Sequence, residues 1–329
     1  MNQGTAPRIR PLAFVMGSMN LLRPIGLAGA PCVAVAPRNA PTARSRFTRG
    51  ALPWEDFSDR TDLLVERLVR FGAAQDVPPI LFYEEDEHLL IISRYREALG
   101  RVFRFVVADP DLVENLVDKN LFHNLAERMG LPVPVTRHLR PAETPLPPDL
   151  DLAFPLIIKP ATRRDTVWRE IGELGKARQV ESAAALRALW PQMVASGRNF
   201  LAQEIVPGPE SCIESYHVYV DGQGEIAGEF TGRKIRTYPA AYGHTTALTI
   251  TNTRDVADLG RALTRQLNLQ GVAKFDFKRA PDGRLYLLEV NPRFNLWHFP
   301  GALAGVSLPA LVYADLAGLP VPVWAGATC

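Results

Sequence analysis

The first 110 residues alternate between short apolar runs and longer segments in which apolar residues recur at helical spacing. This alternation is typical of a parallel, Rossmann-like sheet whose strands are connected by helices. The predicted strands are residues 12–17, 31–37, 78–83 and 101–107, and the predicted helices are residues 18–29, 59–74 and 87–99. A GxGxxG fingerprint is absent, so we do not expect this half to hold a dinucleotide itself.

The rest of the chain mixes helices with more closely spaced strands. Asp109-Pro110 predicts the start of a helix that runs to about Met129, with Gly130 as its end signal. A connection with four prolines follows at 139–150. Further strands are predicted at 154–160, from Lys176 onward, at 199–206, at 212–221 and at 225–232, with a hairpin turn at Asp221-Gly222. Further helices are predicted at 181–196 and at 254–269. Pro191 is expected to kink or shorten the first of these two helices.

The segment 271–294, GVAKFDFKRAPDGRLYLLEVNPRF, predicts a hairpin that brings two carboxylates together. An Asp-Gly pair between two apolar-rich runs is a strong hairpin signal. If Asp282-Gly283 is a two-residue turn, Asp276 lies directly opposite Glu289 on one face of the hairpin. The period of two adds Asn291 to that face.

Two carboxylates and an amide oxygen at one place predict a cation site. Hard oxygen ligands of this kind suit Mg²⁺ (or Mn²⁺) that carries nucleotide phosphates. The alternative is a solvated hairpin face, which Leu287, Leu288 and Val290 argue against because they make the second strand too apolar. Arg293 follows at the strand end, where a guanidinium can bind phosphate or carboxylate oxygens, although a surface arginine is the alternative.

Composition indicates a globular protein of two or three domains. The chain has 329 residues, of which 47% are hydrophobic and 22% charged. We expect a cytoplasmic protein, because no apolar run reaches membrane-span length and the N-terminal run LAFVM is too short for a secretory signal. The three cysteines have no metal-site or disulfide spacing and are expected to be passive. A net charge of +2 does not favour a nucleic-acid or membrane partner, so a small molecule is the expected one.

Lysine is rare in this chain, which has 6 Lys and 31 Arg. A lysine supplies a compact charge to a single phosphate oxygen, whereas the planar guanidinium of arginine binds two oxygens at once. We therefore treat each lysine as a candidate for binding: Lys119, Lys159, Lys176, Lys234, Lys274 and Lys278. Lys274 and Lys278 share the face of Asp276 by period, and either could be a structural counter-ion there.

Taken in order, these residues resemble the ATP-grasp superfamily. The likeness spans roughly residues 109–318. It is nearest to the D-aspartate ligase-like and carbamoyl-phosphate-synthase-like carboxylate-amine ligases, because the segments RKIRTYP (233–239) and EVNPRF (289–294) of this chain resemble sequence motifs of those enzymes. It implies an α/β and α+β fold. Its three parts are a Rossmann-like pre-ATP-grasp domain (1–110), an ATP-grasp small subdomain (111–200) and a large subdomain with the metal hairpin (201–329).

The resemblance also implies a role for each candidate. Lys119 and Lys159 would hold the phosphates of ATP. Adenine would lie over a hinge, QEIVPGPE (203–210), with Gln203 and the backbone of Glu204 to Val206 at its edge and Glu210 at the ribose. Lys234 would neutralise the transferred phosphoryl group, Arg293 would bind the acyl phosphate or its carboxylate, and Asp276, Glu289 and Asn291 would bind the metal. Surface or structural roles remain the alternatives for Lys159, Glu210 and Lys234.

Two departures from the family pattern stand out. The loop after Lys159 is rich in Arg and Glu where relatives often carry glycines, and Arg163 and Arg164 could replace backbone donors there. His298, in NLWHFPG, follows Leu296 and Trp297 where relatives often have small residues. These bulky residues could narrow the substrate side, and a His-aromatic core contact is the alternative.

The predicted function is an ADP-forming, C–N bond-forming ligase that joins a carboxylate to an amine through an acyl phosphate. The alternatives are an ATP-dependent carboxylase or carbamoyl-transferring enzyme on the same fold, and a nucleotide-binding module without turnover. The expected partners are small-molecule carboxylate and amine substrates, met near Glu84 to Asp86, the loop after Gly17, Arg293 and the segment 294–300. The sequence does not identify either substrate. Assembly into a homo-oligomer is a possible further feature.

Overall fold

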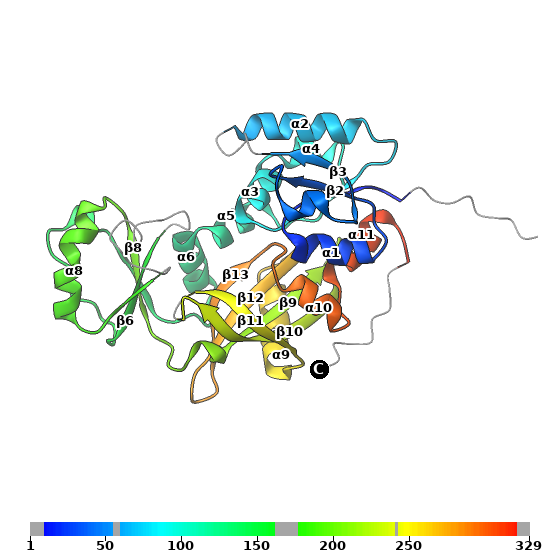
Figure 1. The fold of residues 1–329 in the computed structure, drawn as a ribbon. Coiled ribbons are helices and arrows are strands. Elements are labelled where there is room, and N and C mark those ends of the chain that lie inside the picture. The colour runs from blue at the N-terminus through cyan, green and yellow to red at the C-terminus, as the bar shows by residue number, and fades with distance from the viewer. Residues whose placement is uncertain (1–9, 55–59, 162–176, 241–242, 321–329) are drawn as a thin grey trace, which may run out of the picture.

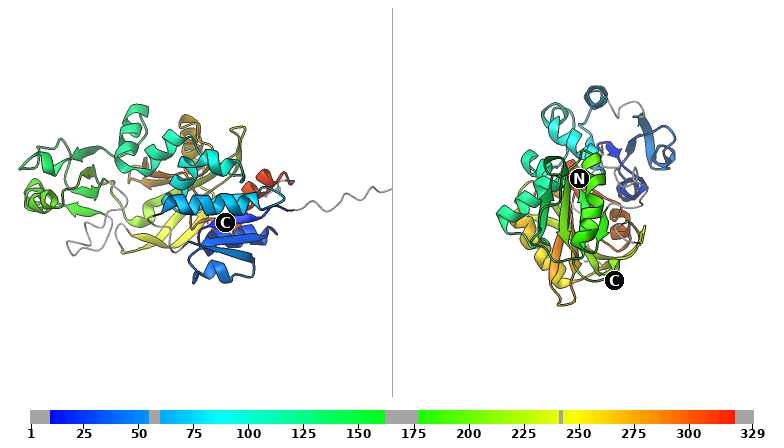
Figure 2. Two further views of the ribbon diagram at one scale, coloured as in Figure 1. Left: turned by 90° about the horizontal axis from the view of Figure 1, so that it is seen from above. Right: turned by 90° about the vertical axis from the view of Figure 1, so that its left-hand side faces the viewer.

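The computed structural model describes residues 10–54, 60–161, 177–240 and 243–320, and the strands within these ranges form three sheets (Figure 1). The N-terminal sheet lies beside the largest, C-terminal sheet, and the middle sheet lies apart from both at one end of the molecule (Figure 2). None of the helices in the described ranges is long and apolar enough to cross a membrane.

The N-terminal sheet is parallel, which confirms the Rossmann-like prediction. Its order is β3-β2-β1-β4, with β1 at Ala13–Met16, β2 at Cys32–Ala36, β3 at Thr48–Pro53 and β4 at Ile80–Tyr83. Every residue of β1 and β4 is buried, as expected for strands covered on both faces. The helices and turns of this part are α1 (Met19–Leu27), η1 (Pro41–Arg44), α2 (Thr61–Ala73), α3 (Asp86–Arg94) and α4 (Arg96–Gly100).

Two predictions for this part were wrong in detail, and one strand was missed. Segment 101–107 is not a strand, because its only sheet contact is an isolated bridge from Arg104 to Ile80. The helix predicted at 87–99 is two helices separated at Tyr95. Strand β3 was not predicted; it is an edge strand in which only Leu52 is fully buried, and it therefore carries no hydrophobic alternation.

The helix predicted from Asp109 to Met129 is also two helices, α5 (Pro110–Val117) and α6 (Lys119–Met129). The Asp118 side chain accepts hydrogen bonds from the backbone N–H groups of Asn120 and Leu121, so it caps α6 and ends α5. Lys119 is therefore the first residue of α6. Gly130 ends this helix in the left-handed conformation, as predicted.

The middle sheet is antiparallel, with the order β5-β8-β6-β7. It consists of β5 (Thr136–Leu139), β6 (Leu156–Pro160), β7 (Arg178–Val180) and β8 (Phe200–Glu204), and it is accompanied by η2 (Pro141–Glu143) and α8 (Ala183–Ala195). Helix α8 runs on past Pro191, so the predicted shortening is wrong. The predicted domain division at residue 200 falls at the start of β8, whose strand partners β5 and β6 place all of it in this sheet.

The C-terminal sheet is antiparallel and carries the predicted hairpin. Its order is β11-β10-β9-β12-β13. The elements from here on are η3 (Glu210–Cys212), β9 (Ile213–Val220), β10 (Ile226–Tyr238), β11 (His244–Thr251), α9 (Arg254–Gln266), β12 (Gly271–Arg279), β13 (Leu285–Asn291), α10 (His298–Leu303) and α11 (Leu308–Ala317). The hairpin predicted at Asp221 connects β9 and β10; β11 was not predicted.

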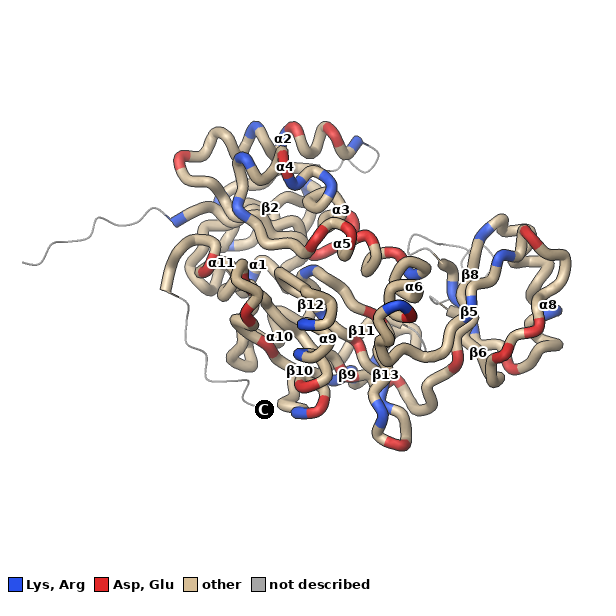
Figure 3. The backbone as a smooth tube through the Cα atoms, turned by 180° about the vertical axis from the view of Figure 1, so that it is seen from behind, with Lys and Arg blue, Asp and Glu red and all other residues tan. Residues whose placement is uncertain are grey.

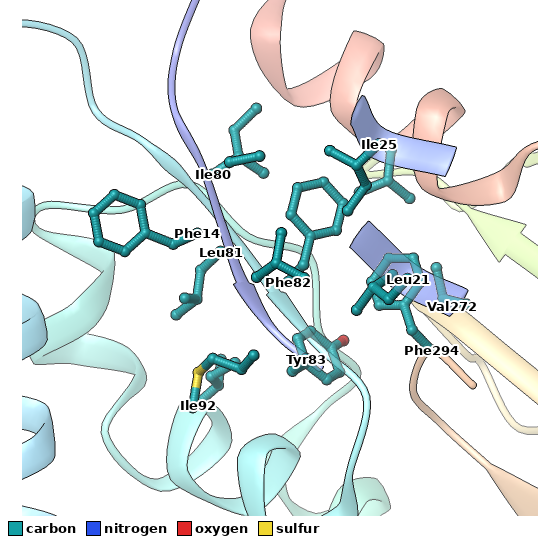
Figure 4. Close-up of a cluster of buried hydrophobic side chains, with 14 of the residues drawn as sticks. Phe14, Leu21, Ile25, Ile80, Leu81, Phe82, Tyr83, Ile92, Val272 and Phe294 are labelled. Atoms are coloured by element: carbon teal, nitrogen blue, oxygen red, sulfur yellow. The ribbon is translucent and has the colours of Figure 1, made fainter. Parts of the chain in front are cut away.

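The N-terminal and C-terminal sheets share one hydrophobic core, whereas the middle sheet has its own. Val272 and Phe294 lie among the side chains of the N-terminal domain, including Phe82 and Tyr83 (Figure 4). The other face of the C-terminal sheet packs against α5, α6 and α9. The core of the middle sheet is a separate cluster that includes Leu156, Trp190 and Phe200.

Candidate active site

The β12–β13 hairpin places Asp276 directly opposite Glu289, as the sequence predicted, but by a different route. The loop has three residues, 281–283, because Ala280 and Arg284 still pair and Gly283 takes a positive φ of 86°. A β-bulge between Asp276 and Phe277 then shifts the register by one residue. The predicted two-residue turn is wrong, and the loop and the bulge together restore the predicted pair.

The bulge also decides where two neighbouring leucines point. Leu287 lies opposite Phe277 and is fully buried in the core between the hairpin and the helices. Leu288 has no directly opposed partner in the register and lines a cavity together with Glu289. The strand thus presents an apolar side chain beside a carboxylate on its ligand-facing side.

This cavity lies between the middle and C-terminal sheets and brings most of the predicted site residues together. Nine of them line it: Lys119, Lys159, Gln203, Glu204, Val206, Glu210, Lys234, Asp276 and Glu289. Pro134, Ile157, Ile213 and Leu288 add apolar surface. Apolar surface combined with convergent charged and polar side chains is the usual form of a small-molecule site.

Asp276 is 1% exposed and is surrounded by donors. The Ser215 hydroxyl donates to its Oδ1. Its Oδ2 lies 2.7 Å from Lys274 Nζ and 3.7 Å from Lys234 Nζ. A buried carboxylate needs such partners to remain charged. Lys274 is therefore the counter-ion that the strand period allowed but did not single out.

Glu289 and Asn291 complete the candidate metal site. Asn291 Nδ2 donates to Glu289 Oε1 at 3.0 Å, and Asn291 lies opposite Lys274. No group of three or more His, Cys, Asp or Glu side chains in the described ranges is arranged to hold a metal. Two carboxylates and an amide still fit Mg²⁺, which is usually held by one or two carboxylates together with substrate phosphates and water.

Two lysines stand at the opposite wall of the cavity. Lys159 Nζ donates to Gln203 Oε1 at 3.0 Å, and Gln203 Nε2 donates to the Thr136 hydroxyl at 2.8 Å, so the buried amide has a fixed orientation. Lys119 Nζ donates to the carbonyl of Pro160 at 3.3 Å. Ammonium groups on α6 and β6 therefore face the same space as the carboxylates of the hairpin.

The hinge after β8 offers backbone and apolar surface. The Glu204 side chain turns away, because its Oε1 accepts from the Ala153 N–H at 3.1 Å. Only the backbone of Glu204 is then available to a ligand, which is the role predicted for this segment. Val206 is buried, and Glu210 begins η3 at the edge of the cavity.

Lys234 lies between the hinge and the carboxylates and stays charged. Burial on its own would lower the pKa of Lys234, but the nearby carboxylates, first Asp276 and then Glu289 and Glu210, outweigh this effect and raise it. A fixed positive charge therefore faces the place where the carboxylate pair would hold a metal–phosphate group.

Arg293 is not brought to this cavity. Its Nε donates to Asp86 Oδ1 at 2.6 Å and its Nη1 to the carbonyl of Glu84 at 2.8 Å, so it links the C-terminal sheet to the N-terminal domain. Figure 3 shows acidic segments along α3 and α5 in this region. The sequence named both Arg293 and the acidic turn as substrate-facing, but their ion pair joins residues 207 positions apart, which a sequence pattern does not reveal.

His298 is fully buried and belongs to an aromatic cluster. Its ring lies 5.2 Å from Phe294 and 6.0 Å from His217, both in edge-on geometry. Burial, with smaller contributions from Lys274 and Arg293, lowers the pKa of His298 to about 3. The structure therefore shows His298 in an aromatic core contact, which the sequence analysis gave as the alternative to a position on the substrate side. Arg163, Arg164, Lys176 and Cys329 lie outside the described residues.

Comparison with known proteins gives a match to a curated sequence and matches to solved structures. No family model matches the chain. It is 25% identical over 219 residues to a D-alanine–D-alanine ligase of Pseudomonas putida (strain GB-1), and the matched region covers 61% of this chain and 64% of that protein. The chain therefore spans slightly less than two thirds of its curated relative.

Solved structures match nearly the whole chain at low identity. A biotin carboxylase from Campylobacter jejuni has a TM-score of 0.70 at 14% identity, with 95% of this chain and 72% of that chain covered. An L-amino acid ligase from Bacillus licheniformis has a TM-score of 0.66 at 14% identity (94% and 75% covered). An N5-carboxyaminoimidazole ribonucleotide synthetase in complex with ADP has a TM-score of 0.67 at 17% identity (95% and 79% covered). These likenesses point together to the ATP-grasp superfamily, and the chain has the ATP-grasp fold that its sequence predicted.

Proposed function

We propose that this protein is an ATP-dependent carboxylate-amine ligase. A carboxylate oxygen attacks the γ-phosphorus of ATP, and ADP leaves. The amine nitrogen then attacks the carbonyl carbon of the acyl phosphate, inorganic phosphate leaves, and the amine gives up a proton. One observation carries the proposal: a single cavity is lined by two lysines on one wall and by a carboxylate pair with Lys234 on the other.

The residues of the cavity can be assigned to parts of the nucleotide. Lys119 and Lys159 would bind phosphates, and the hinge with Gln203, Glu204 and Val206 would meet adenine between apolar walls. Glu210, at the edge of the cavity, would accept hydrogen bonds from the ribose hydroxyls. Each proposed contact agrees with the position of that residue in the cavity lining.

Asp276, Glu289 and Asn291 would hold Mg²⁺, which neutralises phosphate charge when it is bound. Lys234 adds a buried positive charge next to this pair. Charge neutralisation and alignment do most of the work in phosphoryl transfer, so no side chain needs to act as a nucleophile. The chain supplies both.

The matched D-alanine–D-alanine ligase and the L-amino acid ligase favour amide formation over the carboxylase alternative. We therefore propose a small carboxylate and an amine as substrates and no nucleic acid as partner, consistent with a net charge of +2. We also propose that the enzyme works in the cytoplasm, where ATP is available. Cell fractionation and size-exclusion chromatography test the compartment and the assembly state.

The experiment is an ADP-release screen over a matrix of carboxylates and amines. ADP and phosphate should form only when both partners are supplied. With ¹⁸O in the carboxylate, label should appear in the released phosphate, because an acyl phosphate passes one carboxylate oxygen to phosphorus.

Two other outcomes would point elsewhere. AMP and pyrophosphate as products would mean that the carboxylate is activated as an adenylate and would overturn the proposal. ADP release that depends on bicarbonate and needs no amine would favour a carboxylase.

A further inference from the structure

Lys274 lies beside the candidate metal pair and is not among the residues that line the cavity. On β12 it is directly opposite His217 of β9 and Asn291 of β13. Asp276, two residues further along the strand, shares its face, and Lys278 continues that face into the cavity. Lys274, which is 9% exposed, contacts Asp276 next to the cavity lining.

Lys274 and a metal ion would compete for Asp276. Both carboxylate oxygens already have donors, since Ser215 donates to Oδ1 and Lys274 Nζ lies 2.7 Å from Oδ2. Mg²⁺ lies about 2.0 to 2.1 Å from its oxygen ligands, which would bring it within about 5 Å of an ammonium bound to the same oxygen. Two cations this close in a buried site repel each other strongly. Metal binding at Asp276 thus favours release of Lys274 from Oδ2.

The groups that face Lys274 from β9 and α10 do not replace the lost charge. His217 and His298 are both fully buried. Burial is the main cause that lowers the pKa of each ring, and the Lys274 charge adds to it, so both imidazoles are neutral. Neither nitrogen of His217 has a hydrogen-bond partner, and Nδ1 of His298 has none either. A neutral ring can accept a hydrogen bond from the ammonium but cannot balance its charge, whereas an anion can do both.

We propose that Lys274 is an exchangeable counter-ion: it holds Asp276 before the metal–nucleotide complex binds and moves to the anion beside the metal afterwards. That anion is the substrate carboxylate or the phosphate that replaces it. The device makes anion binding depend on prior binding of Mg²⁺ and nucleotide. It rests on the proposed function for the identity of the ligands.

The test uses calorimetric titration of the full-length chain with Mg²⁺·ADP and then with inorganic phosphate, a product of the proposed reaction. Lys274→Met should bind Mg²⁺·ADP about tenfold more tightly than the wild type, because the competing ammonium is gone. The Mg²⁺·ADP complex of this variant should bind phosphate about tenfold more weakly, the loss typical of a charge-assisted contact. ADP without Mg²⁺ should bind both proteins equally.

Two variants control for the removal of charge. Lys274→Arg keeps a cation at the position and should recover most of the phosphate binding. Lys278→Met removes a charge from the same face of β12, two residues beyond Asp276, and should not strengthen Mg²⁺·ADP binding as Lys274→Met does. The ligand-free Lys274→Met protein should also melt at a lower temperature, because Asp276 has lost a partner, and should gain more from Mg²⁺·ADP than the wild type.

Each contrary result has a definite meaning. Equal Mg²⁺·ADP affinity in Lys274→Met and the wild type overturns the competition. Tighter Mg²⁺·ADP binding with unchanged phosphate binding overturns the transfer to an anion. A wild-type protein that binds no Mg²⁺·ADP overturns the proposed function itself, which the first two results do not.

Discussion

The two walls of the cavity belong to differently built parts of the molecule. The wall with Asp276 and Glu289 is part of the C-terminal sheet, which shares a core with the N-terminal domain on one face and packs against helices on the other. The wall with Lys159 and Gln203 is part of the middle sheet, whose core is a separate cluster. In Figures 1 and 2 this middle sheet, with α8, stands apart from the rest.

This difference suggests that the two walls have different roles. The proposed metal ligands Asp276 and Glu289 and their counter-ions are fixed by the largest packed unit, so their geometry is held before any ligand binds. Lys159 and Gln203, which are proposed to meet the nucleotide, are carried by an independently packed unit, which can shift as a body without breaking the main core. Three predictions test this difference, from the largest expected effect to the smallest.

A matched pair of core substitutions separates the two units. Leu156 on β6 and Leu287 on β13 are both fully buried strand leucines, one in each kind of core. Each change to Ala should cost about 2 to 5 kcal/mol of local stability. In hydrogen-exchange mass spectrometry, Leu156→Ala should deprotect the middle sheet alone, whereas Leu287→Ala should deprotect the C-terminal sheet and the N-terminal domain together. Equal deprotection of all three sheets by both variants would mean that the molecule is one cooperative unit.

The metal wall is tested by Glu289→Gln, which removes one charge and keeps the shape. Turnover should fall on the order of 100- to 1000-fold, because a neutral amide is a weaker ligand for the Mg²⁺ whose positive charge would stabilise the transferred phosphoryl group. The melting temperature should change little, since Glu289 is only half-buried. The exposed Glu225→Gln is the matched control and should keep full activity. Comparable activity in the two variants would remove Glu289 from the site.

The nucleotide wall is tested by Lys159→Ala. Loss of a charge-assisted contact should weaken ATP binding by about 1.5 to 3 kcal/mol, measured by titration calorimetry. The variant also leaves Gln203 Oε1 without its Lys159 donor, so Lys159→Met, which keeps the aliphatic stem, is measured beside it. If both variants bind ATP like the wild type, with the fold intact, Lys159 does not contact the nucleotide.

The elements that the sequence predicted well are those with a strong local signal. Strands β1 and β4 are short apolar runs, and the β12–β13 hairpin carries Asp-Gly between two such runs. Strand β3 gave no such signal, because it lies at the edge of the sheet and only Leu52 in it is fully buried. Segment 101–107 gave a false one, since its apolar residues pack against the N-terminal core without pairing as a strand.

The candidate site shows the same limit at the level of side chains. The predicted register gave the pair of Asp276 and Glu289 correctly only because the unpredicted loop length and bulge compensate each other. The scarcity of lysine drew attention to Lys119, Lys159 and Lys234. The partners of Arg293 could not be predicted, because they come from the N-terminal domain and are reached by a long side chain. Lys274 was within the pattern, but only the packed structure shows that its ammonium, and not that of Lys278, contacts Asp276.

Because of the bulge at Leu288, the strand register at the hairpin tip can change by one residue while Asp276 stays opposite Glu289. In the observed register a three-residue loop and one bulge separate the two carboxylates; a two-residue loop without a bulge would bring the same two residues face to face. Only the segment between them would change partners, with Leu288 turning toward the core and Leu287 away from it. Substitutions at 281–283 that alter the loop should therefore disturb packing at the tip and leave the opposition of Asp276 and Glu289 in place.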